Sequence, residues 1–188
     1  MSGSTGRTTV GQLLTPAGQL TTLGDLPLNE ALSPDGRYLI VSNNGQGTQS
    51  LQVIKTATGK VVQTIPYKSP ESLYMGLAFS PDGAHLFASA AGNPKIRTYH
   101  FGCGKLVETS AIQMPVVSPK LTKVNLYPAG LAVTNDSKRL VVADQLADAV
   151  SVIDLATTKS QTTHIGHRPV WVTLAKDAPT AFVASPGG

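Results

Sequence analysis

The sequence predicts an all-β protein, an incomplete β-propeller of about three and a half blades, each a sheet of four antiparallel strands. Residues 28–65, 76–109 and 130–165 align almost residue for residue, and a fourth copy begins at Val170. A repeat of roughly 40 to 55 residues with four short β segments and no helical periodicity is typical of propeller blades. The turn aspartates that mark the repeat are Asp35, Asp82, Asp136 and Asp177.

Each copy begins with a short apolar strand and a tight turn. Leu77-Ala78-Phe79 is apolar throughout, which predicts a strand buried on both faces near a propeller axis. Ser-Pro-Asp-Gly follows at 80–83 and also stands at 33–36. Proline presets φ at the first corner, aspartate accepts a backbone hydrogen bond, and glycine takes the positive φ. In the third copy, Asn135-Asp136-Ser137-Lys138 occupies the same position.

The remaining strands of each copy follow from their hydrophobic patterns. The second strand is rich in large apolar residues, and the third alternates, as in Leu51-Gln52-Val53, which predicts one buried and one polar face. Turns at 58–60 and 102–105 then lead into a polar outer strand. The predicted units are N-terminal strands at 10–25, blades at 26–68, 71–125 (with an insertion at 113–125) and 126–166, and half a blade at 167–188.

Composition narrows the class of protein. With 41% hydrophobic residues in 188, a mainly disordered chain is excluded, and 14% charged residues with abundant Gly and Pro favour turn-rich β structure. The net charge of +4 is scattered, which disfavours nucleic acid as a partner. The chain contains no apolar stretch long enough to span a membrane, and its first residues lack the apolar core of a signal peptide. The compartment stays open, because an exported parent could have lost a leader.

Three motifs resemble a known repeat family. GLAFSPDG (76–83), SVIDLATTK (151–159) and the Thr-Gly-Lys turn (58–60) resemble the YVTN-type repeats of bacterial surface-layer-like and lactonase-like propellers. Residues 13–54 are similar to the start of bacterial proteins in which such a propeller precedes a phosphoesterase domain. The resemblance implies a ring of about seven blades and an exported bacterial parent. The second copy departs from the family pattern at 85–101, and no phosphoesterase metal ligands are present to carry over.

Candidate catalytic and metal-binding residues each have a simpler structural interpretation. His164 and His167 could bind a metal, but their spacing places them on different faces of a strand-to-loop crossing. Ser33 and Ser80 could be arranged into a nucleophile triad with aspartate and histidine, but they stand in repeated turns where backbone hydrogen bonds explain them. The sequon at Asn135 is likewise a turn position. We therefore predict no catalytic residue, no metal site and no cofactor.

Four residues are candidates for contacts at the rim or in the channel of the ring. Asn43 and Asn44 lie in a predicted loop, and Tyr127 and Trp171 stand near the starts of blades, although turn chemistry and core packing explain all four as well. The leading functional hypothesis is a non-enzymatic scaffold or binding module for a protein, glycan or small ligand. The alternatives are the front half of a lactonase-like hydrolase and an accessory domain of a phosphoesterase. A buried cluster of carboxylate, histidine and arginine at the channel mouth would favour the hydrolase.

The predicted half blade has a consequence for association. An unpaired strand edge exposes backbone N–H and C=O groups that can pair with another chain. We therefore expect the chain to form homo-oligomers through unpaired blade edges.

Overall fold

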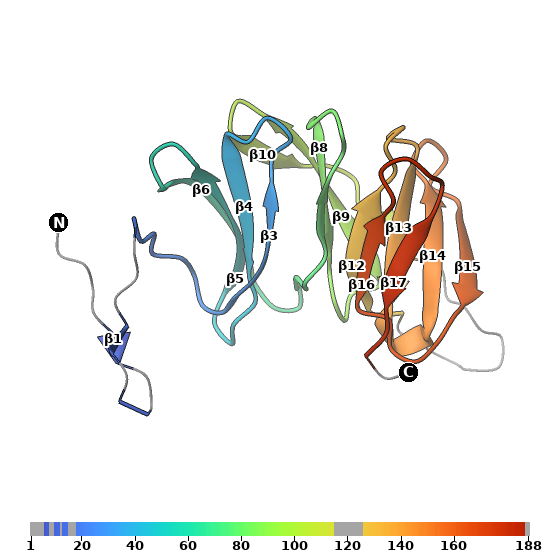
Figure 1. Cartoon of the computed structure of the whole chain (residues 1–188), viewed down its shortest axis with the longest axis horizontal. Coiled ribbons are helices and arrows are strands. Elements are labelled where there is room, and N and C mark those ends of the chain that lie inside the picture. Colours follow the sequence, from blue (N-terminus) through green and yellow to red (C-terminus); the bar gives the residue numbers. More distant parts are fainter. Residues whose placement is uncertain (1–5, 8–9, 12, 15–17, 115–125, 187–188) are drawn as a thin grey trace.

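The fold consists of β-strands joined by turns and loops (Figure 1). The computed structural model describes residues 6–7, 10–11, 13–14, 18–114 and 126–186, and within these ranges a single 3-10 turn, η1 (Gln145–Ala147), is the only helical element. The strands are β1 (Gly6–Arg7), β2 (Leu13–Leu14), β3 (Pro27–Leu32), β4 (Tyr38–Asn43), β5 (Gln49–Lys55), β6 (Lys60–Tyr67), β7 (Leu77–Phe79), β8 (His85–Ser89), β9 (Lys95–Gly102), β10 (Lys105–Glu108), β11 (Ile112–Gln113), β12 (Pro128–Val133), β13 (Arg139–Asp144), β14 (Ala149–Asp154), β15 (Ser160–His164), β16 (Trp171–Leu174) and β17 (Ala181–Ala184).

These strands form a row of antiparallel sheets. The first sheet is β3-β4-β5-β6, the second is β7-β8-β9-β10, the third is β12-β13-β14-β15, and the last is the pair β16-β17. In the second sheet, β11 pairs with β9 beyond the end of β10, so the two short strands share one edge. The first strands of successive sheets contact one another, β3 with β7, β7 with β12, and β12 with β16. The sheets therefore fan out from a common line, as predicted for propeller blades (Figure 1).

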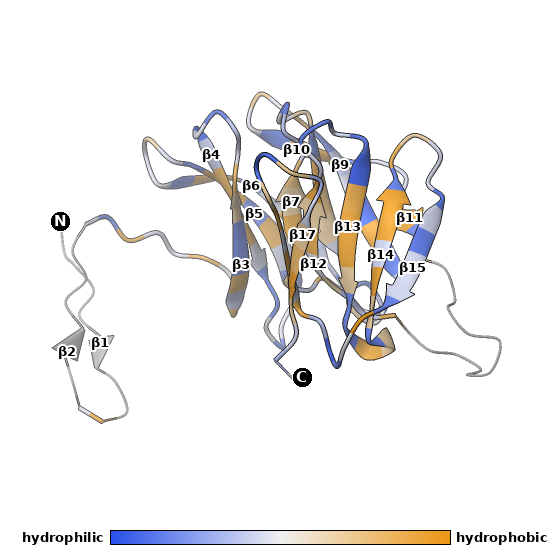
Figure 2. Cartoon of the chain, turned by 45° about the vertical axis from the view of Figure 1, so that its right-hand side comes forward, coloured by the Kyte–Doolittle hydropathy of each residue, from blue (hydrophilic) through white to orange (hydrophobic). Residues whose placement is uncertain are grey.

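Alternation of side chains along each strand builds the core between the sheets. Ile40, Leu51 and Val53 of the first sheet pack with Leu86 and Tyr99 of the second, and all five are 0% exposed. A second cluster lies between the second and third sheets, and a smaller one between the third and last sheets. The outer strand β15 is mainly polar (Figure 2). Burying both faces of every inner sheet explains why the first three strands of each repeat are rich in apolar residues.

The repeated turns between first and second strands are held by one hydrogen-bond pattern. Ser33 Oγ donates to Asp35 Oδ1 (2.6 Å) and accepts from the backbone N–H of Tyr38 (3.0 Å). Hydrogen bonds from Ser33 and from Arg37 lower the pKa of Asp35 to about 2. Ser80 with Asp82 and Thr134 with Asp136 repeat the geometry, so these hydroxyls and carboxylates are turn-forming groups.

The N-terminal region and the insertion differ in detail from the sequence-based expectation. Strand β2 lies within the predicted N-terminal range, its partner β1 precedes that range, and residues 18–25 contain no strand. Instead, Gln19 Nε2 donates to Thr58 O (2.8 Å) and Thr21 Oγ1 donates to Gly59 O (2.7 Å), which fastens this segment to the first sheet. Most of the predicted insertion, residues 115–125, lies outside the described residues. The predicted limits of the N-terminal strands (10–25) and of the insertion (113–125) therefore stay predictions.

Candidate functional site

Antiparallel connectivity gives the molecule two ends with different loops. We call one end the turn face, which holds the tight turns after the first and third strands of each sheet. We call the other end the loop face, which holds the longer loops after second strands and the connections between sheets. Within the described residues, the loop face consists of residues 25–26, 44–48, 68–76, 90–94, 126–127, 145–148 and 165–170.

Of the eight described non-glycine residues with a left-handed φ, five lie on the loop face and three (Cys103, Ser137 and Thr158) lie in tight turns of the turn face. The five on the loop face are Leu26, Ala91, Tyr127, Asp148 and Arg168, with φ between 48° and 52°, in the left-handed region that non-glycine residues rarely adopt. Three of the five stand directly before a proline. Such outliers cost about 1 to 3 kcal/mol each and often accompany functional sites. The strain makes the loop face the first place to look for a binding site.

An aromatic pair joins two connections of the loop face. The rings of Tyr74 and Tyr127 meet edge to face with centroids 5.1 Å apart, and both residues are half-buried. Tyr74 Oη donates to Gln145 Oε1 (3.2 Å), which ties the connection before the second sheet to the loop of the third sheet. Burial raises the pKa of Tyr127 above its usual value, so its hydroxyl stays protonated at neutral pH. The pair presents flat apolar surface beside amide and hydroxyl groups.

A carboxylate contacts a histidine side chain and the backbone of an arginine on this face. Asp148 Oδ1 accepts the backbone N–H of Arg168 (2.8 Å), and Asp148 Oδ2 lies 3.6 Å from His167 Nδ1. The hydrogen bond from Arg168 lowers the pKa of Asp148 below its usual value. The side chains of His167 and Asp148 are 76% and 46% exposed, so this group is solvated. It lacks the burial by which enzymes tune acids and bases.

The two predicted rim asparagines occupy different environments. Asn43 is 0% exposed, and its Nδ2 donates to Ser50 Oγ (3.1 Å) and Gln52 Oε1 (3.0 Å), so it braces the end of the β4-β5 hairpin. Asn44 is half-buried, and both polar atoms of its amide are buried without a hydrogen-bond partner among the described residues. The Oδ1 atom of Asn43 is likewise buried without a hydrogen-bond partner among the described residues, so the two residues differ only at the amide nitrogen.

Trp171 stands apart from the aromatic pair. It begins β16, pairs with Ala184 across the last sheet, and is 42% exposed. Phe182, which is 60% exposed, lies on the neighbouring strand. Trp171 therefore contributes to the open face of the last sheet, whereas Tyr127 lies on the loop face. Whether either residue contacts a ligand stays a prediction.

Sequence reasoning missed a buried carboxylate. Asp144 ends β13 opposite Pro128, as Asn43 ends β4 opposite Pro27, and it is 0% exposed. Ser151 Oγ donates to Asp144 Oδ2 (2.5 Å), while Oδ1 has no hydrogen-bond partner among the described residues. Burial raises the pKa of Asp144 to about 7. The sequence does hold a signal for this residue: in the alignment of the repeats, Asp144 stands where the first repeat has Asn43, at the end of an apolar second strand.

Arg97 was also missed, because its partners are distant in sequence. Its side chain is 5% exposed and joins Glu71 and Glu108 in ion pairs, with the guanidinium carbon 4.3 Å from the centroid of the Tyr67 ring. The hydroxyls of Tyr67 and Tyr99 lie 2.6 Å apart, and burial raises the pKa of both above the usual range. The cluster connects the first and second sheets, so we interpret it as structural.

We expect Arg97→Ala to destabilise the fold by about 2 kcal/mol, because it leaves two carboxylates without their buried cation and removes the contact with Tyr67. The partial exposure of Glu71 and Glu108 keeps the loss below that of a fully buried ion pair. Urea unfolding followed by circular dichroism measures it. The control is Arg37→Ala, which removes an exposed pair with Asp35 and should leave the urea midpoint nearly unchanged. Equal shifts for both variants would contradict a structural role for the cluster.

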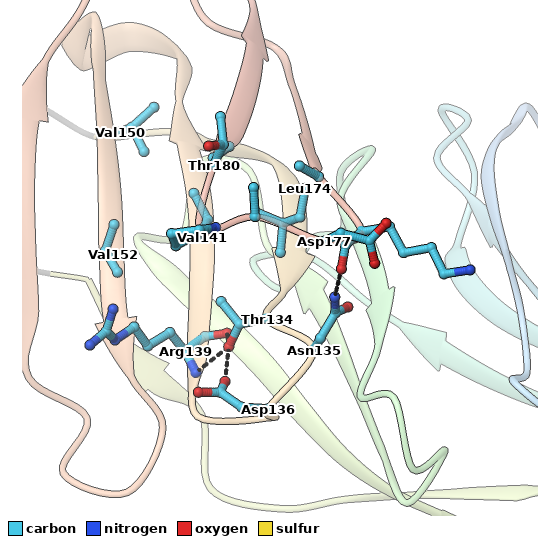
Figure 3. Close-up of a pocket in the computed structure, with 15 residues that line it drawn as sticks. Thr134, Asn135, Asp136, Arg139, Val141, Val150, Val152, Leu174, Asp177 and Thr180 are labelled. Carbon is cyan, nitrogen blue, oxygen red and sulfur yellow. Dashed lines mark hydrogen bonds between the residues drawn. The ribbon is translucent and has the colours of Figure 1, made fainter.

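Two cavities lie between sheets toward the turn face. One of about 510 Å³ separates the third and last sheets, with Val141, Val150 and Val152 on one side and Leu174 and Thr180 on the other (Figure 3). The other, about 580 Å³, lies between the second and third sheets and is lined in part by Ser80, Asp82 and His85. Ser80 Oγ donates to Asp82 (2.5 Å) and accepts from the backbone of His85, so the turn accounts for its hydrogen bonds.

The described part of the chain contains no group of three or more His, Cys, Asp or Glu residues placed to hold a metal ion. It also contains no helix with the length and apolar character of a membrane span.

Comparison with known proteins identifies the fold. No family model matches the chain, and no curated protein matches it in sequence. Among solved structures, it resembles hydrazine synthase of Kuenenia stuttgartiensis (TM-score 0.69, 20% identity), over 93% of this chain and 47% of that one. It also resembles a candidate 6-phosphogluconolactonase of Bacteroides uniformis (0.68, 14%), over 96% and 56%. A third similar structure is the WD40 repeats of RRP9 (0.64, 15%), over 81% and 43%.

The chain thus spans about half the length of these structures. At such identities the likeness carries information on the fold alone. With two four-stranded antiparallel sheets, a five-stranded one and a two-stranded one fanned around a common line, the chain is an incomplete β-propeller.

Proposed function

We propose that this chain is a binding module whose loop face receives a protein, glycan or small ligand, and that it carries no catalytic residues of its own. The observation that carries the proposal is the contrast between the two ends. On the turn face, hydroxyls and carboxylates satisfy one another and the backbone in the first three repeats. The loop face carries the pair Tyr74 and Tyr127, the buried amide of Asn44, and five of the eight described non-glycine residues with a left-handed φ.

The chemistry of the loop face suits a polar ligand with apolar surface. An edge-to-face tyrosine pair offers a flat contact at low entropic cost, and nearby amides offer both donors and acceptors. Gln145 supplies such an amide. The loop face therefore favours recognition of mixed polar and apolar groups.

We further propose that the repeats are of the YVTN type. The support is the equivalence of Asn43 and Asp144, each at the end of a second strand and each opposite a proline of the first strand. Both polar side chains brace the hairpin that follows, through Ser50 and Ser151. A polar residue at this position in the first and third repeats agrees with the asparagine that names the family, whereas the second repeat departs from the pattern with Ala90.

A second candidate function is the front half of a lactonase-like hydrolase. The specific observation in its favour is the meeting of Asp148 with His167 on the loop face. Two similar structures, from Bacteroides uniformis and Bacteroides fragilis, are candidate 6-phosphogluconolactonases. The high exposure of both side chains favours the binding module over this alternative. No described residue specifically favours the accessory role beside a phosphoesterase.

The proposal is tested by mapping ligand contacts on the 15N-labelled chain. A panel of soluble oligosaccharides and small aromatic amides is titrated, and amide chemical shifts are followed by NMR. We expect the shifted amides to cluster around residues 44, 74, 127 and 145. Tyr127→Ala should weaken binding of the best compound at least about fivefold, a loss of about 1 kcal/mol.

The matched control for this titration is Lys138→Ala on the turn face, which should bind as the wild type does. Circular dichroism spectra of both variants establish that they are folded. Shifts confined to the turn face, or no binding by any compound of the panel, would overturn the assignment of the loop face.

A further inference from the structure

We propose that the cavity of about 580 Å³ between the second and third sheets binds a small aromatic amine, a molecule with a flat ring and a positive charge. This inference goes beyond the proposed function, because the cavity lies toward the turn face, whereas the proposed ligand site lies on the loop face. Both sheets that enclose the cavity contain at least four strands. The incomplete last sheet therefore takes no part in it.

In the preceding interface, between the first and second sheets, aromatic side chains fill the equivalent space. Tyr38 of β4 meets Phe101 of β9 edge to face, with ring centroids 5.6 Å apart, and Phe79 of β7 meets Phe101 at 5.3 Å. The three rings pack against the apolar cluster between these sheets. A Cβ added to Gly104, in the turn after β9, would lie 2.5 Å from Tyr38 Cε1. Aromatic rings therefore close the turn end of this interface.

The interface between the second and third sheets lacks this aromatic filling. At the three equivalent positions of the repeat, His85 stands in place of Tyr38, Val133 in place of Phe79, and Leu155 in place of Phe101. Thr158 takes the place of Gly104, and it lines the cavity together with His85 and Leu155. Because one imidazole and two aliphatic side chains fill less space than three six-membered rings, a cavity remains. A ligand ring would occupy the volume that aromatic side chains fill one interface earlier.

The size and the walls of the cavity suit such a ring. Ligand sites typically measure about 300 to 1,000 Å³, and a cavity of about 150 Å³ already holds benzene. A volume of about 580 Å³ therefore has room for a fused ring and a short amine chain. Phe87 and Ile112, both 6% exposed, form apolar walls. His85, whose ring meets that of His100 edge to face at 5.9 Å, adds an aromatic wall that a ligand ring can contact.

Carboxylates give the rim of the cavity its charge. Asp82, in the turn after β7, and Asp154, at the end of β14, both line the cavity. Hydrogen bonds from side-chain hydroxyls of their own turns lower the pKa of both, so they are ionised at neutral pH. Within the described ranges neither is in an ion pair, whereas Asp35, the equivalent of Asp82 in the first sheet, pairs with Arg37. A ligand ammonium group would supply the cation that these two carboxylates lack.

Lys138 is a cation that also lines the cavity. It lies in the same turn as Asp136, whose pKa is lowered by hydrogen bonds from Thr134 and from the Lys138 backbone, and by the Lys138 charge. Lys138 thus has a carboxylate in its own turn. With histidine counted as neutral, two carboxylates and one ammonium leave the described lining with a net negative charge, which favours a cationic ligand.

The test is an NMR titration of the 15N-labelled full chain with tryptamine at neutral pH. For a ligand of this size we expect a dissociation constant of about 0.1 to 1 mM, with shifted amides around residues 80, 87, 98 and 155. Tryptophol, which has a hydroxyl in place of the ammonium group, should bind about fivefold more weakly, because the carboxylates are partly exposed. Equal affinities would overturn the assignment of a cationic ligand. The absence of shifts at concentrations well above this range would overturn the inference.

His85→Tyr tests the location of the site, because it restores the aromatic residue of the preceding interface and fills the cavity. It should weaken tryptamine binding at least about tenfold and leave the urea midpoint equal to or above that of the wild type. The matched control, His164→Tyr, makes the same change at an exposed histidine of β15 that does not line the cavity, and it should bind as the wild type does. Unchanged affinity in His85→Tyr, or shifts centred on residues 74 and 127 of the loop face, would overturn the inference.

Asp82→Asn tests the charge of the site. Asparagine keeps a side-chain oxygen for the hydrogen bonds that Ser80 and the backbone of Ala84 donate to Asp82, so the turn is retained. The variant should bind tryptamine about threefold more weakly and tryptophol as the wild type does. Asp35→Asn, in the equivalent turn of the first sheet, is the matched control and should leave both affinities unchanged. Equal losses in the two variants would contradict the role of Asp82 in binding a cation.

Discussion

Gly76→Ala is expected to destabilise the fold by about 3 kcal/mol or more, since overpacking against backbone atoms leaves no flexible group to yield. Gly76 immediately precedes β7, a strand of the second sheet that contacts β12 of the third sheet. A Cβ added there would overlap the carbonyl oxygen of Ala129 and lie 2.7 Å from both Leu131 Cγ and Ser89 Oγ. The substitution must push the first strands of two sheets apart.

Urea unfolding of Gly76→Ala measures this loss, and Gly47→Ala is the matched control. Gly47 has an ordinary φ and no atom within 4 Å of an added Cβ, so its substitution should leave stability nearly unchanged. An unfolding midpoint of Gly76→Ala equal to that of the wild type would contradict the close contact between Gly76 and the backbone of Ala129.

Asp144→Asn is expected to stabilise the protein above pH 7 by up to about 4 kcal/mol. In the folded protein burial raises the pKa of Asp144 to about 7, whereas an unfolded aspartate titrates near 3.8. Between these values the folded state holds a proton that the unfolded state has released, so stability falls as the pH rises from about 4 to about 7. Three pKa units correspond to about 4 kcal/mol. Asparagine removes this cost because it cannot ionise.

Asparagine also suits the site, because the equivalent position in the first sheet is Asn43. The measurement is the difference in unfolding free energy between variant and wild type at pH 4, 5.5, 7 and 8.5. The difference should be near zero at pH 4 and largest at pH 8.5. Using the difference cancels the other carboxylates, such as Asp35 and Asp82, whose pKa values are lowered. A difference that does not vary with pH would show that Asp144 titrates normally.

Most of the fold could be predicted from local pattern. Three of the patterns depend only on residues close together in sequence: the Ser-Pro-Asp-Gly turns, the apolar first strand Leu77–Phe79, and the alternation of Leu51 with Gln52. Because these patterns recur along the chain, they predicted four strands per sheet. The N-terminal segment was harder, because Gln19 and Thr21 are held by residues almost forty positions away.

The candidate site was less predictable for the same reason. Asn43 and Asn44 are neighbours in sequence with the same side chain, yet the amide nitrogen of Asn43 donates two hydrogen bonds and that of Asn44 has no partner among the described residues. The contact between Tyr74 and Tyr127 joins two different connections. The hydrophobic pattern of the sequence cannot predict a side-chain contact between two connections that are far apart in the chain.

The amino-acid sequence alone determined the strands, their tight turns and the repeat, because φ preferences and the alternation of apolar residues act over a few residues. Only the tertiary structure decided which polar groups are buried and which edges stay open. Asp144 became a raised-pKa carboxylate, and Arg97 the centre of an ion-pair cluster, through the packing of whole sheets. Burial and electrostatics depend on everything that surrounds a group, and that environment exists only once the sheets have packed.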